Sequence, residues 1–248
     1  MSSWFPAICP PRGEAPLRLY CFPHAGGGAH VFRAWAAAFG EAVEVQPIQW
    51  PGRLDRSREA PIRIMELAVD AAFNEMRTHI DRPFAILGHS LGARIGAEVA
   101  QRFERAAEPP AAFIALACSG GAWSAGSVDG LSDDELTRRI LARRWTAPEI
   151  MAHAELRQMT LDVLRADLAI AATSRLEQLV LRTPILALGG HEDGSVSRQA
   201  IALWHDRGES VVETAMHGGG HFFPHQHVDT TVRAVTQFLQ RCLRDRTG

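Results

Sequence analysis

The chain has 248 residues, of which 46% are hydrophobic and 22% are charged, and this is enough to enclose one substantial hydrophobic core. Its formal net charge is -2 and its arginines are scattered, so it lacks the positive field with which proteins grip nucleic acid. No run approaches the roughly 18 apolar residues of a membrane span, and residues 1–16 lack a signal-peptide pattern, so we expect a cytoplasmic protein that contacts neither nucleic acid nor membrane.

Short apolar runs alternate with helical patterns along most of the chain. The apolar runs predict strands at residues 17–22, 43–49, 84–88, 112–118, 184–189 and 210–216. Between them lie amphipathic patterns such as residues 62–80, where apolar side chains recur at i, i+3 and i+4 spacing. Most of the strands are too apolar to be half exposed. The alternation therefore predicts an α/β fold with a mostly parallel central sheet and helices on both faces.

The alternation stops between about residues 120 and 182. Three helices are expected there, near residues 132–144, 148–158 and 161–176, and the first opens with the capping box SDDE from Ser132 to Glu135. We expect a single domain over residues 1–248, in which these helices form a lid over the carboxyl edge of the sheet. A surface excursion that covers nothing is the alternative.

The motif Gly88-His89-Ser90-Leu91-Gly92 directly follows the predicted strand at residues 84–88 and precedes a helical pattern. This is the GxSxG nucleophile elbow in its required context, so the sequence predicts an α/β-hydrolase fold with Ser90 as nucleophile. A turn this tight strains the serine backbone and leaves no room for larger residues at Gly88 and Gly92. The alternative is a glycine-rich turn that happens to hold a serine.

A serine nucleophile needs a base, and the base needs a third group that fixes its tautomer. Acidic residues follow the strand at residues 184–189, and we assign the orienting carboxylate to Asp193, with Glu192 as the rival. After the last predicted strand comes the loop His217-Gly218-Gly219-Gly220-His221, which can carry an imidazole to the serine. We assign the base to His221.

The remaining histidines of this region are expected to be bystanders. His217 lies nearer the end of the strand and is the weaker candidate for the base, whereas His225 and His227 lie beyond the loop and are expected to be solvated. The final amphipathic helix is expected at residues 228–243.

The oxyanion of a tetrahedral intermediate needs two amide donors. Leu91 supplies the first, and Ala25, in the glycine-rich segment from Phe22 to Gly28, is expected to supply the second. That segment lacks both GxGxxG and GxxxxGK[ST], which argues against phosphate binding. The pattern HGGGH does not place two ligands on one helix face, and the cysteines show no CxxC spacing. We expect neither a metal ion nor a cofactor.

Several further stretches have the spacing and order of one family. They are CFPHAGG from Cys21 to Gly27, QWPGRLDR from Gln49 to Arg56, GHSLGA from Gly88 to Ala93, LRADL from Leu164 to Leu168, and the pair GGHEDGSVS and GGHFF near the C-terminus. The sequence resembles the stand-alone type II thioesterases that accompany polyketide and non-ribosomal peptide synthetases.

The resemblance implies hydrolysis of acyl thioesters on the phosphopantetheine arm of acyl or peptidyl carrier proteins. The reaction would remove aberrant or stalled chains or release product. Ser90, Asp193 and His221 match the triad positions of the family, and Ala25 and Leu91 match its oxyanion donors. Two alternatives remain open, namely a carboxylester hydrolase or acyltransferase with the same triad and a non-catalytic binding protein with the same fold.

Two segments depart from the family pattern. The segment SGGAWSAG from Ser119 to Gly126 replaces a basic stretch, and LRADLAIAATS from Leu164 to Ser174 lacks acidic and tyrosine positions. Both are expected near the substrate chamber, where Trp123 and Trp145 would favour a larger or more apolar acyl chain, unless they are core residues of the lid.

Overall fold

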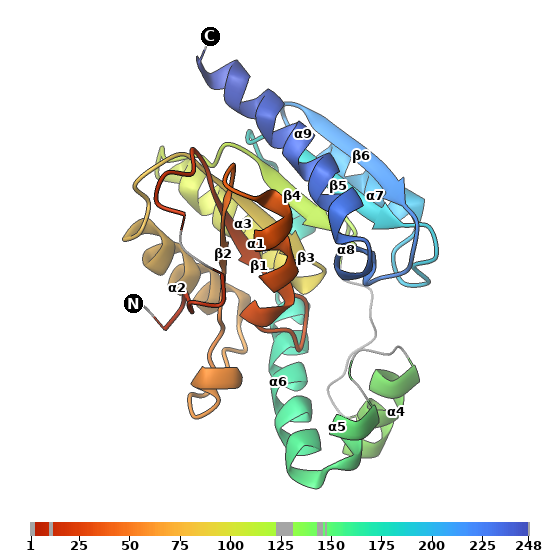
Figure 1. Cartoon of the computed structure of the whole chain (residues 1–248). Coiled ribbons are helices and arrows are strands. Elements are labelled where there is room, and N and C mark those ends of the chain that lie inside the picture. The colour runs from red at the N-terminus through yellow and green to blue at the C-terminus, as the bar shows by residue number, and fades with distance from the viewer. Residues whose placement is uncertain (1–2, 10–11, 123–130, 143–145, 147, 248) are drawn as a thin grey trace.

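The computed structural model describes residues 3–9, 12–122, 131–142, 146 and 148–247. Within these residues six strands form one parallel sheet in the order β2-β1-β3-β4-β5-β6 (Figure 1). The strands are β1 (Arg18–Phe22), β2 (Glu44–Pro47), β3 (Phe84–His89), β4 (Phe113–Leu116), β5 (Ile185–Gly190) and β6 (Val212–His217). Each begins and ends within two residues of the apolar run that predicted it, and the expected parallel sheet is confirmed.

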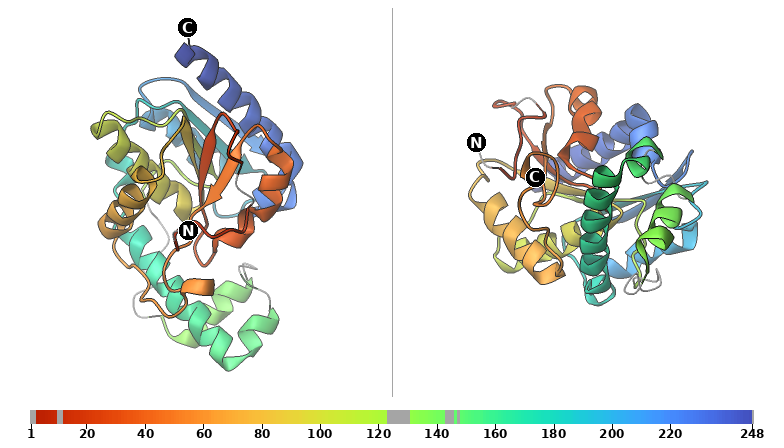
Figure 2. Two further views of the ribbon diagram at one scale, coloured as in Figure 1. Left: turned by 60° about the vertical axis from the view of Figure 1, so that its left-hand side comes forward. Right: turned by 90° about the horizontal axis from the view of Figure 1, so that it is seen from below.

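Helices cover both faces of the sheet (Figures 1 and 2). On one face α1 (Arg33–Phe39) packs beside α9 (Val228–Thr247), and Trp35 and Phe238 are buried beneath them. On the other face α2 (Met65–Arg77) packs beside α3 (Leu91–Arg105), with Phe103 and Phe113 between the helices and the sheet. The shorter elements are α7 (Arg198–Ala202), α8 (Phe223–Gln226) and 3-10 turns at Ala29–Phe32, Leu54–Arg56, Leu176–Gln178 and Leu203–Arg207. This two-sided covering explains why the central strands are apolar on both faces.

The segment between β4 and β5 contains the helical insertion that the sequence predicts. Its described helices are α4 (Asp133–Ala142), α5 (Pro148–Ala152) and α6 (Ala154–Ala172), which we call the lid, and they extend beyond one end of the sheet (Figure 1). The lid has a small core of its own, formed by Leu136, Ile140, Met151, Leu161, Leu164 and Leu168. The fold class is therefore the expected α/β-hydrolase type with an inserted lid. The single domain over residues 1–248 stays a prediction.

The predicted break inside the lid is wrong. The sequence suggested that one helix ends at Gln158 and the next begins at Leu161, but α6 runs unbroken through both positions. The hydroxyl of Thr160 donates to the carbonyl of Leu156 at 2.7 Å, so this polar residue is accommodated within the helix. The chain breaks earlier, at His153, whose extended backbone (φ -88°, ψ 119°) precedes α6.

Two further expectations concern the tryptophans near the acyl chain and the absence of membrane-spanning helices. Trp123 and Trp145 lie outside the described residues, so their proposed contact with the acyl chain stays a prediction. No helix in the described part of the chain combines the length and the apolarity needed to cross a bilayer.

Candidate active site

Ser90 lies at the sharp turn between β3 and α3. Its backbone has φ 55° and ψ -116°, a conformation that non-glycine residues adopt only when the surroundings impose it. A Cβ added to Gly88 would lie 2.3 Å from backbone atoms of Gly92 and Ala93, and one added to Gly92 would lie 2.2 Å from the carbonyl oxygen of Phe22. The predicted elbow geometry is therefore present. It presents the Ser90 hydroxyl at the N-terminus of α3.

The imidazole of His221 joins Ser90 to Asp193. Nε2 of His221 lies 3.0 Å from the Ser90 hydroxyl, and Nδ1 lies 2.7 Å from a carboxylate oxygen of Asp193. The side chain of Asp193 is only 1% exposed, whereas Glu192 is exposed. The structure thus brings together Ser90, His221 and Asp193, the three residues that the sequence selected, and leaves the rival Glu192 outside the chain of hydrogen bonds.

The carboxylate of Asp193 is held in its ionised form. Burial opposes ionisation, but hydrogen bonds and charge from His221, together with donors from Ser195, lower the pKa of Asp193. The backbone amide and the hydroxyl of Ser195 donate to the second carboxylate oxygen at 2.8 and 2.6 Å. Sequence reasoning did not identify Ser195. The Asp-Gly-Ser order at residues 193–195, which is typical of an Asx turn, is the signal that points to it.

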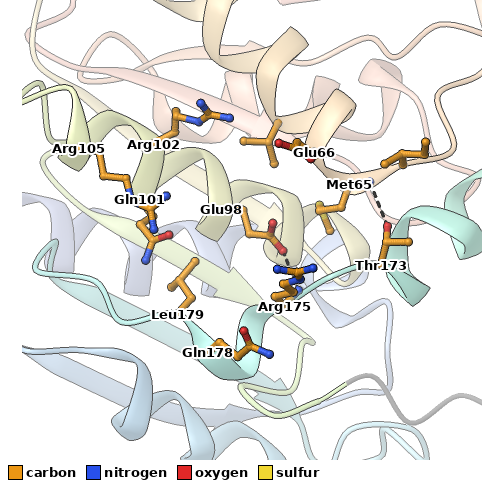
Figure 3. Close-up of a pocket in the computed structure, with 12 residues that line it drawn as sticks. Met65, Glu66, Glu98, Gln101, Arg102, Arg105, Thr173, Arg175, Gln178 and Leu179 are labelled. Atoms are coloured by element: carbon orange, nitrogen blue, oxygen red, sulfur yellow. Dashed lines mark hydrogen bonds between the residues drawn. The ribbon is translucent and has the colours of Figure 1, made fainter.

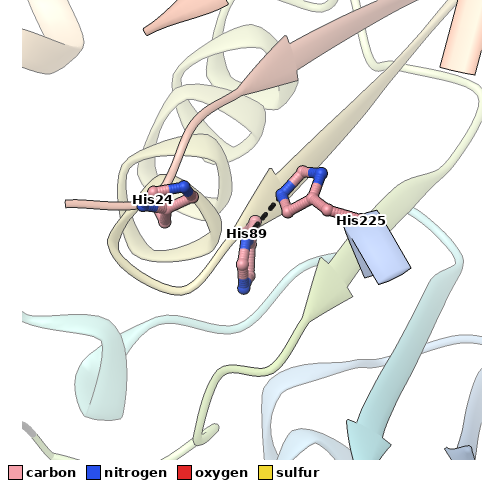
Figure 4. A group of neighbouring side chains, drawn as sticks. All are labelled: His24, His89 and His225. Atoms are coloured by element: carbon pink, nitrogen blue, oxygen red, sulfur yellow. Dashed lines mark hydrogen bonds between the residues drawn. The ribbon is translucent and has the colours of Figure 1, made fainter. Parts of the chain in front are cut away.

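His24, His89 and His225 form a cluster of neighbouring side chains (Figure 4), which contacts the loop of residues 217–221, here called the catalytic loop. Nε2 of His89 donates to the carbonyl of His221 at 2.9 Å, so Nδ1 of this neutral ring is an acceptor and lies 3.0 Å from Nε2 of His225. His24 packs edge-on against His89, with ring centroids 5.1 Å apart. The expectation that His225 is solvated is therefore wrong: its ring is packed between elements far apart in the sequence. His89 supports the backbone of His221.

Among the described residues, these three rings form a group that is close enough together to hold a metal ion. One nitrogen from each ring lies within 4.8 Å of the others. However, the 3.0 Å contact between His89 and His225 already uses the lone pair that His89 would offer to a metal. We assign the cluster a hydrogen-bonding role, and the absence of a metal cofactor stays a prediction.

One cavity adjoins Ser90, and a larger groove lies next to it. A small pocket of about 40 Å³ is lined by Ser90, Leu91, His221, Ala25 and the lid residue Asp167, among others. Its walls at His24 and Phe222 also line a groove of about 820 Å³ between the lid and the loops of the sheet. Ala25 and Leu91, the expected oxyanion donors, thus lie beside the hydroxyl whose reaction they would assist.

A separate cavity of about 560 Å³ lies between α2, α3 and the segment after α6 (Figure 3). Its wall is polar and carries both signs of charge, including Glu98, Arg102 and Arg105. Glu98 accepts hydrogen bonds from the Ser174 hydroxyl and the Arg175 amide, so it is already satisfied within the wall. None of the triad residues lines this cavity, and we do not place the reaction there.

Comparison with known proteins decides the family. The model of the thioesterase domain matches residues 17–239. The chain belongs to the thioesterase family. The thioesterase is 30% identical to the gramicidin S biosynthesis protein GrsT of Aneurinibacillus migulanus, with 86% of this chain and 84% of GrsT covered. It is 31% identical to thioesterase TesA of Mycobacterium marinum, with 90% and 92% covered.

The fold of the thioesterase is similar to solved structures of type II thioesterases. The type II thioesterase BorB of the borrelidin biosynthetic cluster matches with a TM-score of 0.86 and 31% identity, over 96% of this chain and 98% of BorB. RedJ, the thioesterase of the prodiginine pathway in Streptomyces coelicolor, matches with a TM-score of 0.80 and 28% identity, over 93% and 91%. The interpretation as a type II thioesterase, related to those of polyketide and non-ribosomal peptide clusters, is confirmed.

The buried histidines predict a pH dependence of folding for the thioesterase. Burial lowers the pKa of both His24 and His225 from 6.5 to about 4. Between these pH values the unfolded chain binds more protons than the folded protein. The stability that the two neutral rings contribute is therefore fully present above pH 6.5 and is lost as the pH falls toward 4. The free energy of unfolding, measured by urea denaturation, should fall by about 2 to 3 kcal/mol per pH unit in this range, because each of the two histidines contributes up to about 1.4 kcal/mol per unit.

A variant with His225→Asn should show a shallower slope, because it removes one buried base. His205 is exposed, so His205→Gln is the matched control and should leave the slope unchanged. A slope that stays the same in the His225 variant would contradict the assignment of this pH dependence to the cluster.

Proposed function

We propose that this thioesterase hydrolyses acyl thioesters carried on the phosphopantetheine arm of acyl or peptidyl carrier proteins. Ser90 acts as nucleophile, His221 as general base and acid, and Asp193 as the group that orients His221. The observation that carries the proposal is the continuous hydrogen-bond chain from Ser90 through His221 to Asp193, with contacts of 3.0 and 2.7 Å. The removal of stalled chains and the release of product are both compatible with this chemistry.

Each step of the proposed hydrolysis is assigned to a residue of the site. The Ser90 hydroxyl attacks the thioester carbonyl and passes its proton to Nε2 of His221, while the amides of Ala25 and Leu91 bind the oxyanion. Collapse of the intermediate breaks the carbon–sulfur bond, and His221 protonates the leaving thiolate. Water then attacks the acyl-serine with His221 again as base, which yields the free acid and restores Ser90. A thiolate is a good leaving group, so binding and access rather than protonation set the selectivity.

The groove of about 820 Å³ is the proposed path for the acyl arm. It shares the lining residues His24 and Phe222 with the catalytic pocket, and the exposed apolar side chains in its lining are Leu54, Leu141, Ile150, Leu156 and Met159. A groove with apolar walls next to a nucleophile suits a long acyl or pantetheine chain better than a compact polar ester.

The choice of leaving group tests the proposal against its nearest rival. With one acyl chain, kcat/KM should be at least about tenfold higher for the carrier-bound thioester than for the matching oxygen ester. Addition of an alcohol or an amine should leave the free acid as the main product. An equal or faster reaction with the oxygen ester, or acyl transfer to the added nucleophile, would favour a carboxylester hydrolase or acyltransferase. Failure of a fluorophosphonate probe to label Ser90 would favour a non-catalytic binding protein.

The cytoplasm is the proposed location of the reaction. Cys9, Cys21, Cys118 and Cys242 are all buried and unpaired with one another. Free thiols persist in reducing compartments, where disulfides are rare.

A further inference from the structure

A buried ion pair joins the lid to the segment after β2. The carboxylate of Asp167, on α6, is 2% exposed, and it meets the guanidinium of Arg53, which is 8% exposed. Two parallel hydrogen bonds of 2.7 and 3.0 Å connect them, the fork arrangement in which arginine binds carboxylates most strongly. The partners are separated by 114 residues in the chain.

Both members of the pair also hold the loop of residues 23–28, which we call the oxyanion loop because it contains Ala25. The amide of Gly26 donates to Asp167 at 2.7 Å, and Arg53 donates to the carbonyl of Gly27 at 2.8 Å. Ala25 itself packs against the apolar core of the lid. Two adjacent residues of the oxyanion loop are therefore held from different sides. Asp167 of the lid binds Gly26, and Arg53 of the segment after β2 binds Gly27.

The charge of Asp167 requires a partner at this place. Asp167 lines the catalytic pocket together with Ser90 and His221. An uncompensated carboxylate there would oppose the negative charge that develops on the oxyanion, and its burial without a counter-ion would be unfavourable. Arg53 neutralises this charge and leaves the carboxylate free to hold the amide of Gly26.

We propose that Arg53 and Asp167 are positioning residues that couple the docking of α6 to the shape of the oxyanion loop. When the lid helix is seated, the pair fixes Gly26 and Gly27 and so aims the amide of the neighbouring Ala25 at the reacting carbonyl. When α6 moves away, the loop loses this support and the oxyanion site loses one donor. This inference rests on the proposed function through the role of Ala25.

Conservative substitutions test the coupling without removing bulk. Arg53→Lys keeps the positive charge but cannot form the two parallel hydrogen bonds to the carboxylate. Asp167→Asn keeps the shape of the side chain but loses its negative charge. Each should lower kcat for a small acyl thioester by about 10- to 100-fold while KM changes by less than about threefold, because a misplaced oxyanion donor weakens mainly the transition state. The double variant should be about as slow as the slower single variant, since the two residues act as one unit.

A second ion pair on the same helix supplies matched controls. Arg165, also on α6, pairs with Asp133 at 2.7 Å in a more exposed position, and within the described residues its side-chain hydrogen bonds go to Asp133 and to the carbonyl of Leu131, not to the oxyanion loop. Arg165→Lys and Asp133→Asn make the same chemical changes there. Both should leave kcat within about twofold of the unmodified protein.

Hydrogen–deuterium exchange provides a readout that is independent of activity. In Asp167→Asn, amide exchange should become faster in residues 24–28 and stay unchanged in β3, whereas Asp133→Asn should change neither segment. Unchanged exchange in residues 24–28, kcat within about threefold in both single variants, or losses that multiply in the double variant would each overturn the coupling. If the unmodified protein hydrolyses no thioester, the proposed function fails, yet the exchange experiment still decides whether the lid holds the loop.

Discussion

Replacement of Ser90 by alanine should reduce kcat for thioester hydrolysis by about 10⁵-fold, because the group that forms the covalent intermediate is lost. The fold should be retained. Alanine is smaller than serine, and its backbone amide can still donate to the carbonyl of Leu116, a contact that measures 2.8 Å. Single-turnover measurements with carrier-bound and small thioesters would quantify the loss. Both substrates should be affected alike, since the change acts on chemistry and not on docking.

Ser195 offers a control for this experiment. Its hydroxyl lies 3.2 Å from Nδ1 of His221, so Ser195→Ala removes a hydroxyl from the same hydrogen-bond network without removing the nucleophile. A loss of about tenfold or less is expected for Ser195→Ala. Turnover of Ser90→Ala within tenfold of the unmodified protein, or a larger loss in the Ser195 variant, would show that another residue attacks the substrate.

Local sequence signals were sufficient to predict the sheet and the elbow. The strands are continuous apolar runs, and this pattern follows directly from burial on both faces of a parallel sheet. The strain at Ser90 could be inferred because the glycines on either side indicate a turn where a Cβ would clash, and the structure shows such clashes at Gly88 and Gly92. The pairing of Ser90 with His221 followed from chemical necessity, since a serine hydroxyl needs a base.

The features that escaped prediction depend on contacts between distant segments. His225 lies 136 residues from His89, and its burial is determined by the packing of α8 under the catalytic loop. Arg53 and Asp167 belong to motifs that the sequence analysis singled out, PGR and RAD, but neither motif reveals its partner. Periodicity and propensity describe neighbours along the chain, so the pairing of two charged groups 114 residues apart is visible only after folding.

Conversion of Asp193 to asparagine should be the next most severe change, with a loss of about 10⁴-fold in kcat. The carboxylate accepts a hydrogen bond from Nδ1 of His221, which leaves Nε2 free to take the proton of Ser90. An asparagine amide can donate at the same place, which stabilises the tautomer with hydrogen on Nε2 and so removes the base. The hydrogen bond and charge of His221 also lower the pKa of Asp193, so the carboxylate is ionised at neutral pH.

The fold should tolerate this change better than the reaction does. An asparagine oxygen can still accept from the amides of Ser195 and Val196, which now lie 2.8 and 3.2 Å from Asp193, so the loop is expected to keep its shape. Glu192 is the matched control because it is adjacent, acidic and exposed, and Glu192→Gln should change kcat by less than about twofold. Measured kcat values for both variants, with circular dichroism to verify folding, distinguish the two carboxylates. If Glu192→Gln proved the slower enzyme, the orienting role would belong to Glu192, and the hydrogen bond between His221 and Asp193 would not be the one used in catalysis.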